Sequence, residues 1–257
     1  MLEDAGRLCP YGCQFGDCRS NPPASPWALS RARRCMDVSV ALAALTTFAL
    51  PMLALAAVIR LTSRGRALFS QQRVGRGGQL FRIFKFRSMK RNAQEDAPLL
   101  VAAEDGRVTP LGRLLRRVKA DELPQLYNVL RGDMALVGPR PKLPRYAEIF
   151  AMPYRPGLTG AATLIFHAEE EMLRAIDEPC RDEFYARAVK PLKTRLDLCY
   201  MCRATFASDC RVLLRTARNC VRCSRGVPGS QPLIPVEGGE MARGGEGLAG
   251  GASIPGQ

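Results

Sequence analysis

The sequence predicts a mostly helical α+β protein with a small β-hairpin and amphipathic helices, anchored by an N-terminal proline-broken re-entrant membrane helix. Three observations lead to this fold class: a long apolar run between basic flanks, two strand-like runs joined by glycines, and apolar residues at helical spacing farther on. The chain has 257 residues, of which 47% are hydrophobic, and a formal net charge of +14. It can therefore bury a core, and its charge calls for an anionic partner: nucleic acid, an acidic membrane face or a phosphorylated substrate.

Composition divides the chain into four parts. Residues 1–30 show no apolar periodicity, and residues 224–257 are rich in Gly and Pro without any aromatic residue. Neither end can bury enough apolar surface to offset its ordering entropy, so we expect both to be disordered. The remaining parts are a re-entrant membrane helix over residues 31–62 and one folded domain over residues 63–223.

The membrane helix is predicted from Val38–Ile59, which has 22 residues and no charge. As a helix it is about 33 Å long, close to the thickness of the bilayer hydrocarbon. Basic residues flank both ends, which favours the cytoplasm for both flanks. Pro51 near the middle removes a backbone donor, so we expect the helix to break there and return to the same face. A plain tilted span with a tolerated proline is the alternative.

A β-hairpin should follow the membrane helix. Leu68–Val74 and Gln79–Phe86 are strand-like, and residues 75–78 between them supply three glycines and an arginine. The second strand leads into Lys85 and Arg87, two cations near its end. Such a turn is either a backbone nest for phosphate or, more commonly, a turn without a ligand.

A short helix is predicted after residue 122. Apolar residues recur there at i, i+3, i+4 and i+7, with Pro124 suited to the first turn and Gly132 to the end; these residues are Leu123, Leu126, Tyr127 and Leu130. Asp121 and Glu122 stand just before the helix. They are either ordinary caps or carboxylates held ready to act as a nucleophile or a metal ligand.

Several cations lie close to this acidic pair in sequence. Arg116 precedes it, and Arg140 follows between two prolines that would hold it in a stiff loop. A guanidinium in such a loop can clamp a phosphate group in bidentate fashion. Phosphate is therefore the substrate chemistry that this region favours.

The C-terminal part of the domain carries two further patterns. Residues 195–222 are basic and amphipathic, which suits either a membrane surface or a solvated exterior. Cys199, Cys202, Cys220 and Cys223 have the spacing of a four-cysteine zinc site, although their helical setting also suits small apolar residues.

Taken in order, these motifs resemble the bacterial sugar transferase family, the monotopic polyprenyl-phosphate phosphoglycosyl transferases that start the assembly of surface glycans. The resemblance extends over roughly residues 31–220 and is carried by the basic start and proline-containing helix of 34–60, Gln72–Gly75, Lys85–Met89, Asp121–Leu126, Asn128–Met134, Val137–Pro141 and Arg155–Gly160. After Gly160 the chain departs from the pattern of many members, so the donor sugar cannot be inferred from it.

The resemblance implies an enzyme that moves a sugar 1-phosphate from a UDP-sugar to polyprenyl (undecaprenyl) phosphate with Mg²⁺. Asp121 would be the nucleophile that releases UMP and forms a phosphosugar ester, and Glu122 would assist or, with Asp121, hold the metal. Lys85, Arg87, Arg116 and Arg140 would face the phosphates.

The cellular setting follows from the same resemblance. It implies a catalytic domain on the cytoplasmic face of the bacterial inner membrane, in contact with membrane lipids and serving exopolysaccharide or lipopolysaccharide synthesis. Downstream glycosyltransferases are partners that such a role allows. Nucleic acid is not expected as a partner in this interpretation.

A basic, zinc-containing nucleic-acid-binding protein is the alternative from another functional class. It accounts for the +14 charge and the cysteine spacing. It gives no role to the apolar run, and aromatic residues at 7% provide few platforms for base stacking.

Overall fold

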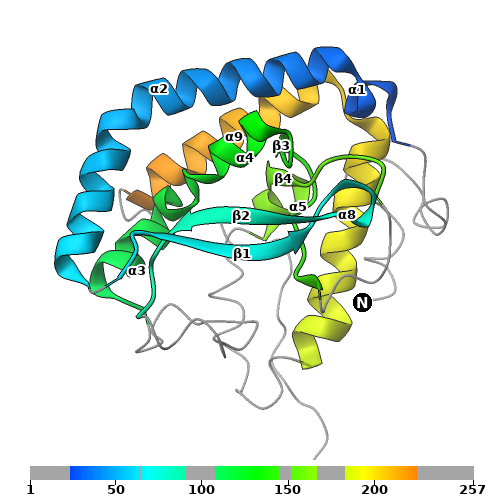
Figure 1. Ribbon diagram of the computed structural model, residues 1–257. Helices are drawn as coiled ribbons and strands as arrows, with labels where there is room; N and C mark the ends of the chain where they lie inside the picture. The colour runs from blue at the N-terminus through cyan, green and yellow to red at the C-terminus, as the bar shows by residue number, and fades with distance from the viewer. Residues whose placement is uncertain (1–23, 64, 91–107, 145–151, 167–182, 225–257) are drawn as a thin grey trace, which may run out of the picture.

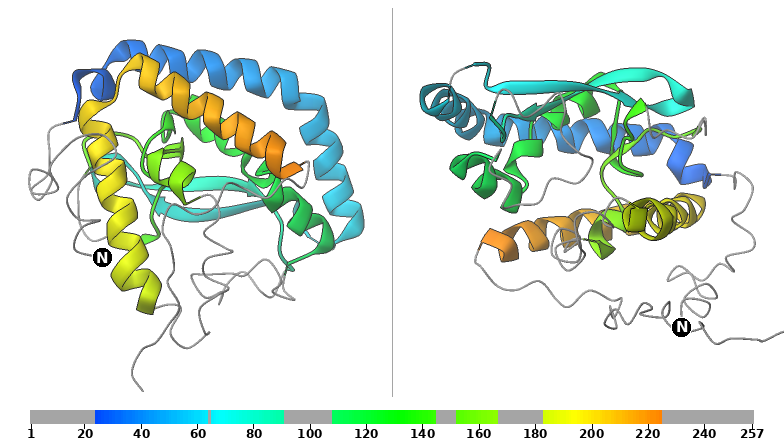
Figure 2. Two further views of the ribbon diagram at one scale, coloured as in Figure 1. Left: turned by 180° about the vertical axis from the view of Figure 1, so that it is seen from behind. Right: turned by 90° about the horizontal axis from the view of Figure 1, so that it is seen from below.

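A computed structural model describes residues 24–63, 65–90, 108–144, 152–166 and 183–224 (Figure 1). Figure 2 shows that the elements lie in three layers, with the β-hairpin on one side of α2 and α4, and with α8 and α9 on the other. Most of the expected N-terminal extension and nearly all of the expected C-terminal tail lie outside the described residues.

The fold begins earlier than the expected residue 31. Ser25 caps α1 (Pro26–Leu29) by accepting a hydrogen bond from the amide of Ala28. The backbone amide of Ser25 donates to the carbonyl of Met201 on α8, and its hydroxyl donates to the carbonyl of Ala204. Residues 24–30 are therefore packed against the C-terminal helices, contrary to the expected boundary.

The apolar run forms one long helix, α2 (Arg31–Thr62), capped at its start by Ser30. The helix continues through Pro51, so the expected break in the helix is wrong. Figure 1 shows instead that the helix axis bends, and an internal proline is a common cause of such bends. In its most apolar stretch only 6% of residues are buried, unlike a core helix of a soluble protein. By length and composition α2 is a candidate membrane segment.

The predicted hairpin is confirmed. Strands β1 (Leu68–Val74) and β2 (Leu80–Phe86) pair antiparallel, from Leu68 opposite Phe86 to Val74 opposite Leu80. The connecting turn η1 (Arg76–Gly78) has positive φ angles of 63° at Gly77 and 79° at Gly78, which explains the glycines.

The predicted short helix is also confirmed, as α4 (Gln125–Arg131). It follows α3 (Pro110–Arg117) and the 3₁₀ turn η3 (Ala120–Glu122), and it ends at Gly132 with φ 97°. Asn128 joins α4 to β2, since its side-chain oxygen accepts from the amide of Phe84 and its amide nitrogen donates to the carbonyl of Arg82. This contact sets the turn before α4 against the hairpin.

A second, two-stranded parallel sheet packs against α4 and α9 and was not predicted. Strands β3 (Ala135–Val137) and β4 (Gly157–Thr159) approach so closely that a Cβ atom at Gly157 would collide with the backbone of Gly138. Glycine at position 157 is therefore required by packing.

Helices α5 (Ala161–Ile165), α8 (Lys190–Arg203) and α9 (Phe206–Ser224) complete the described structure, with a π-helical turn η5 (Tyr185–Val189) before α8. The main core joins the layers through buried apolar side chains that include Val129, Met134, Val137, Tyr200, Met201 and Val212.

A buried polar cluster fastens α1 and α2 to α9. The Asp209 carboxylate of α9 is fully buried and accepts hydrogen bonds from Arg33 Nε at 2.8 Å, Trp27 Nε1 at 2.9 Å and the Tyr200 hydroxyl at 2.6 Å. Because both charged partners are out of contact with water, loss of one leaves the other unpaired in a poorly solvating interior.

We expect Asp209→Ala to lower the free energy of unfolding by about 3–5 kcal/mol, because it strands the buried Arg33 guanidinium. Thermal unfolding of the full chain in detergent should show a fall in Tm of about 10 °C. Glu183→Ala is the matched control, since Glu183 is exposed and its pair with Arg187 is also exposed, so its loss should change Tm little. Equal effects of the two substitutions would contradict the role given to Asp209.

Candidate active site

Asp121 and Glu122 lie in η3, the 3₁₀ turn between α3 and α4, and both are buried. Lys119 immediately before the turn has φ 57°, a left-handed conformation that reverses the chain direction after α3. Helix α4 begins only at Gln125, and its N-cap position, Pro124, makes no side-chain capping bond. The carboxylates therefore do not serve as the N-cap of α4, which was the simpler of the two sequence interpretations.

Glu122 binds two cations from other parts of the fold. Its Oε1 atom accepts a hydrogen bond from Lys85 Nζ on β2 at 3.1 Å and another from Arg140 Nη2 in the loop after β3. Burial by itself would raise the pKa of Glu122, but the charges of Arg140, Lys85 and Lys119 lower it well below its ordinary value. Glu122 is therefore ionised and holds the two cations in place.

Asp121 is held differently from its neighbour. Its Oδ1 atom is buried and has no hydrogen-bond partner among the described residues. Burial and the adjacent charge of Glu122 raise the pKa of Asp121, while Lys85, Lys119 and Arg116 oppose that rise. A carboxylate oxygen without a donor is available to a cation or to an electrophilic atom of a ligand.

Arg116 lies on α3 next to this pair. Its Nε atom donates to the hydroxyl of Ser88 at 3.0 Å, and its charge acts on Asp121. Of the sequence-predicted cations, the structure thus brings Lys85 and Arg140 into contact with Glu122 and places Arg116 within electrostatic range of Asp121.

Arg87 occupies a separate position. Its guanidinium donates to the carbonyl of Ser63 at 2.8 Å and to the Ser63 hydroxyl at 2.5 Å, with a longer contact to the carbonyl of Ile59. These contacts fasten the end of α2 to the hairpin. A phosphate contact for Arg87 stays a prediction.

Arg73 of β1 was not predicted as a site residue, although it lies in one of the motifs that carried the resemblance. Burial and the nearby charge of Arg140 lower its pKa to about 10, and Glu122 opposes that shift. Its Nη1 donates to the carbonyl of Pro141, yet its buried Nε has no partner among the described residues. Gln125 Nε2 is likewise buried without a partner there. Both groups are donors that a bound anion would satisfy.

The site suits a metal ion that needs few protein ligands. Among the described residues, no group of three or more His, Cys, Asp or Glu side chains is placed to hold a metal. Mg²⁺ is commonly bound through one or two carboxylates together with substrate phosphates and water. The unpartnered Asp121 oxygen fits that chemistry, with Glu122 beside it. The four cysteines that have zinc-type spacing lie on two different helices. Cys199 and Cys202 are on α8, and Cys220 and Cys223 are on α9.

Chemically, the site presents an unpartnered oxygen of Asp121 within range of the charges of Lys85, Lys119 and Arg116, while Arg140 binds the neighbouring Glu122. Lys85, Arg116 and Arg140 come from a strand, a helix and a loop, so the hairpin, α3 and the end of β3 must all pack correctly to assemble it. This arrangement suits an anionic, phosphate-bearing ligand and attack by a carboxylate on phosphorus.

Comparison with known proteins agrees with this chemistry. The family model described as bacterial sugar transferase matches residues 28–223. A UDP-glucose:undecaprenyl-phosphate glucose-1-phosphate transferase of Caulobacter vibrioides is 47% identical over 158 residues, covering 56% of this chain and 57% of that protein. A UDP-N-acetylgalactosamine-undecaprenyl-phosphate N-acetylgalactosaminephosphotransferase of Aeromonas hydrophila is 41% identical over 142 residues, covering 52% of this chain and 34% of that protein.

A third relative is matched over most of its length. The exopolysaccharide production protein PSS of Rhizobium leguminosarum is 33% identical over 199 residues, which cover 72% of this chain and 92% of that protein. Against the first curated relatives, by contrast, the chain spans between about a third and two thirds of their length. The family match alone extends over more than half of the chain. The chain therefore belongs to the bacterial sugar transferase family.

Proposed function

We propose that this protein is a membrane phosphoglycosyl transferase that moves a sugar 1-phosphate from a UDP-sugar to undecaprenyl phosphate and so starts the synthesis of an exopolysaccharide or another surface glycan. The observation that carries the proposal is the unpartnered Asp121 oxygen beside a Glu122 that already holds two cations. Relatives named for the transfer of a sugar phosphate to undecaprenyl phosphate supply the substrate class. Family membership argues against the alternative of a zinc-containing nucleic-acid-binding protein.

In the first half of the reaction, an oxygen of ionised Asp121 attacks the sugar-bearing phosphorus of the UDP-sugar. A bond forms between that oxygen and phosphorus while the phosphoanhydride bond breaks, and UMP leaves with the bonding electrons. Lys85, Arg116 and Arg140 would stabilise the negative charge on the diphosphate, and their positions next to Asp121 and Glu122 support this role.

In the second half, an oxygen of undecaprenyl phosphate attacks the same phosphorus. The bond between Asp121 and phosphorus breaks, so the carboxylate is regenerated and the lipid carries the diphosphate-linked sugar. Glu122 keeps Lys85 and Arg140 in position through both halves, because its ion pairs do not involve the reacting atoms.

Mg²⁺ is the proposed cofactor, held by Asp121 and Glu122 together with the donor phosphates. It would neutralise charge on the diphosphate as the anhydride bond breaks. The buried Asp121 oxygen without a donor supports this assignment.

We further propose that α2 is re-entrant and anchors the domain on the cytoplasmic face of the inner membrane. Leu50, Leu53 and Leu61 are among its exposed apolar side chains, and the helix bends along its length (Figure 1). Helix α9 is proposed to lie on the same surface, since Phe206, Leu214 and Val221 are also exposed. This placement would bring the site to the depth of a lipid phosphate.

The nucleophile is tested by Asp121→Asn, which keeps the size of the side chain but removes its nucleophilic carboxylate. UMP release from a UDP-sugar should fall by about 1000-fold or more, and intact-mass spectrometry should no longer detect a phosphosugar adduct. Glu183→Gln is the control, because Glu183 is an exposed residue just before η5. It should leave both UMP release and the adduct unchanged. Persistence of the adduct in Asp121→Asn would exclude Asp121 as the nucleophile.

Metal dependence is tested by dialysis against EDTA. We expect UMP release to stop and to return when MgCl₂ is added, since Mg²⁺ held by Asp121 and Glu122 would neutralise charge on the diphosphate. CaCl₂ at the same ionic strength is the control for a general salt effect. Full turnover in metal-free buffer would refute the magnesium assignment.

The re-entrant arrangement is tested by labelling both flanks of α2 in a cysteine-free background. Arg31→Cys and Arg66→Cys should react with a membrane-impermeant maleimide from the same side, only after the cells are opened. The control is a cysteine in a known periplasmic segment fused to the protein. Its labelling in intact cells shows that the reagent reaches the outer side of the membrane. Labelling of the two flanks from opposite sides would establish a spanning helix.

A further inference from the structure

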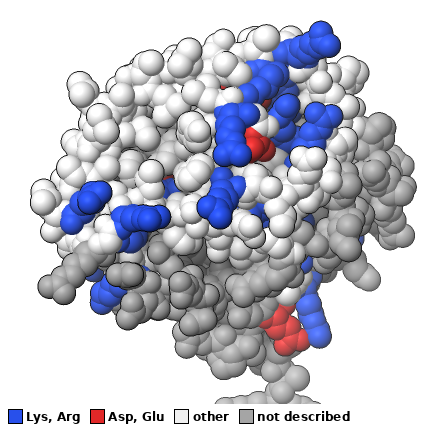
Figure 3. Space-filling view, in the orientation of Figure 1, with Lys and Arg blue, Asp and Glu red and all other residues white. Residues whose placement is uncertain are grey.

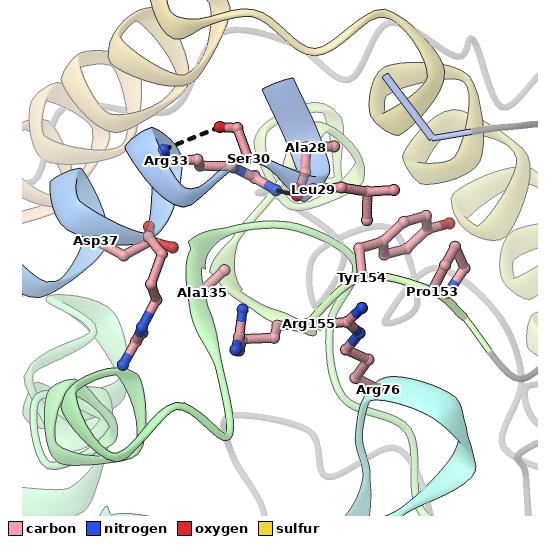
Figure 4. A pocket seen from close by; sticks show the side chains of 11 residues that line it. Ala28, Leu29, Ser30, Arg33, Asp37, Arg76, Ala135, Pro153, Tyr154 and Arg155 are labelled. Carbon is pink, nitrogen blue, oxygen red and sulfur yellow. Dashed lines mark hydrogen bonds between the residues drawn. The ribbon is translucent and has the colours of Figure 1, made fainter. Parts of the chain in front are cut away.

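A second group of guanidinium groups lies at the N-terminal end of α2, apart from the Asp121–Glu122 site (Figure 4). An open recess of about 320 Å³, including solvent at its mouth, is lined there by Arg33, Arg34 and Asp37 of α2, Arg76 of the hairpin turn, and Arg155 before β4. Figure 3 shows basic side chains gathered over the region where Figure 1 places the C-terminal end of α4. The three basic segments are far apart in sequence and are brought together only by folding.

The four arginines differ in how their donors are used. Arg33 donates to Asp209 and to the carbonyls of Ala28 and Val137, so its guanidinium is committed to the fold. Arg34 donates to the carbonyls of Val129 and Leu130 at the end of α4. Arg155 uses its Nε for the carbonyl of Gly132 at 2.7 Å.

Donors remain after these contacts. Within the part of the chain that the structure describes, neither Arg76 nor the terminal nitrogens of Arg155 donate a hydrogen bond. Figure 4 shows that Arg76 and Arg155 line neighbouring parts of the recess, with their guanidinium groups pointing in different directions. Guanidinium groups that share one recess supply N–H donors and positive charge to a phosphate group.

The charge of the recess is poorly balanced by the protein. Asp37 is the acid that lines it, and one oxygen of Asp37 already accepts the amide of Leu136 at 3.0 Å. The pKa of Arg155 is lowered by burial and by the charges of Arg34 and Arg76, and Asp37 opposes this only in part. A bound oxyanion would relieve the repulsion between these guanidinium groups.

The recess is separate from the catalytic pair. Arg34 and Arg155 contact the C-terminal end of α4, while Asp121 and Glu122 precede its N-terminal end. Seven helical residues separate the two ends, which is about 10 Å.

The surroundings of the recess are apolar on the side of α2. Leu29, which lines it, is half exposed, and α2 continues into its exposed apolar stretch with Val40 and Leu42. A phosphate group attached to an acyl chain would find cations at the recess and apolar contacts beside it.

We propose that Arg34, Arg76 and Arg155 form a second phosphate-binding site, which takes the phosphate group of a membrane lipid where α2 enters the bilayer. The lipid source rests on the membrane placement proposed above. Phosphate chemistry is common to a lipid headgroup and free inorganic phosphate, so the experiment must separate the two.

The test measures binding to the purified full chain in neutral detergent by native mass spectrometry and thermal shift. Three probes are compared: dioleoylphosphatidylglycerol, dioleoylglycerol, which lacks the phosphate, and inorganic phosphate. Arg76→Ala should weaken binding of the phosphatidylglycerol about tenfold. Arg76→Lys should have an affinity between those of the unchanged protein and Arg76→Ala, since lysine keeps the charge but lacks the planar guanidinium with its paired donors. Dioleoylglycerol should not distinguish the variants.

Arg82→Ala is the matched control, because Arg82 is an exposed arginine of the same hairpin and does not line the recess. The proposal is overturned if Arg76→Ala binds as the unchanged protein does, or if Arg82→Ala loses as much affinity. If inorganic phosphate alone shows the Arg76 dependence, the lipid assignment is overturned. The binding assay contains no UDP-sugar and requires no turnover. UMP release is a separate measurement, so loss of lipid binding and absence of enzyme activity can be distinguished.

Discussion

The first two turns of α2 connect the layers of the fold through buried polar contacts, and the rest of the structure depends on them. Arg33 binds Asp209 of α9, Arg34 binds the last carbonyls of α4, and Asp37 accepts the amide of Leu136 in β3. Beyond Asp37 the helix is apolar and mostly exposed. The helix thus has a start held by polar contacts, a mostly exposed apolar stretch, and a C-terminal end that Arg87 fastens to the hairpin.

The same contacts reach the catalytic pair through α4. Arg34 fixes the C-terminal end of α4, while Asn128 in its middle binds the backbone of β2. With both held, the turn η3 before α4 must face the end of β2, and Glu122 meets Lys85. The position of the two carboxylates is therefore determined by backbone contacts on a rigid helix rather than by a mobile loop.

Local patterns in the sequence predicted the hairpin, α4 and the acidic pair, because each depends on neighbouring residues: alternating strands around glycines, apolar spacing, and a turn at Gly132. Such local patterns could not predict contacts between segments that are distant in sequence. Nothing near Arg87 indicates that it binds the end of α2, and Arg73 is recognised as a site residue only once Arg140 is beside it. The parallel pairing of β3 with β4 joins two strands of three residues, too short to show a period. Pro51 was expected to interrupt α2, but the helix continues through Pro51 and bends along its length.

The adjacent carboxylates have different surroundings, and this difference matters for the proposed chemistry. A carboxylate tied up in ion pairs is a poor nucleophile, because its lone pairs are committed and its charge is balanced. Glu122 takes the contacts of Lys85 and Arg140, which leaves Asp121 with an unpartnered oxygen and a raised pKa. Higher basicity and an available lone pair are what attack on phosphorus requires. Because Glu122 already holds Lys85 and Arg140 beside Asp121, these cations need no large movement to act on an arriving diphosphate. In the proposed mechanism the two carboxylates thus have different roles: Glu122 positions the cations, and Asp121 has an oxygen available to the metal and to the substrate phosphorus.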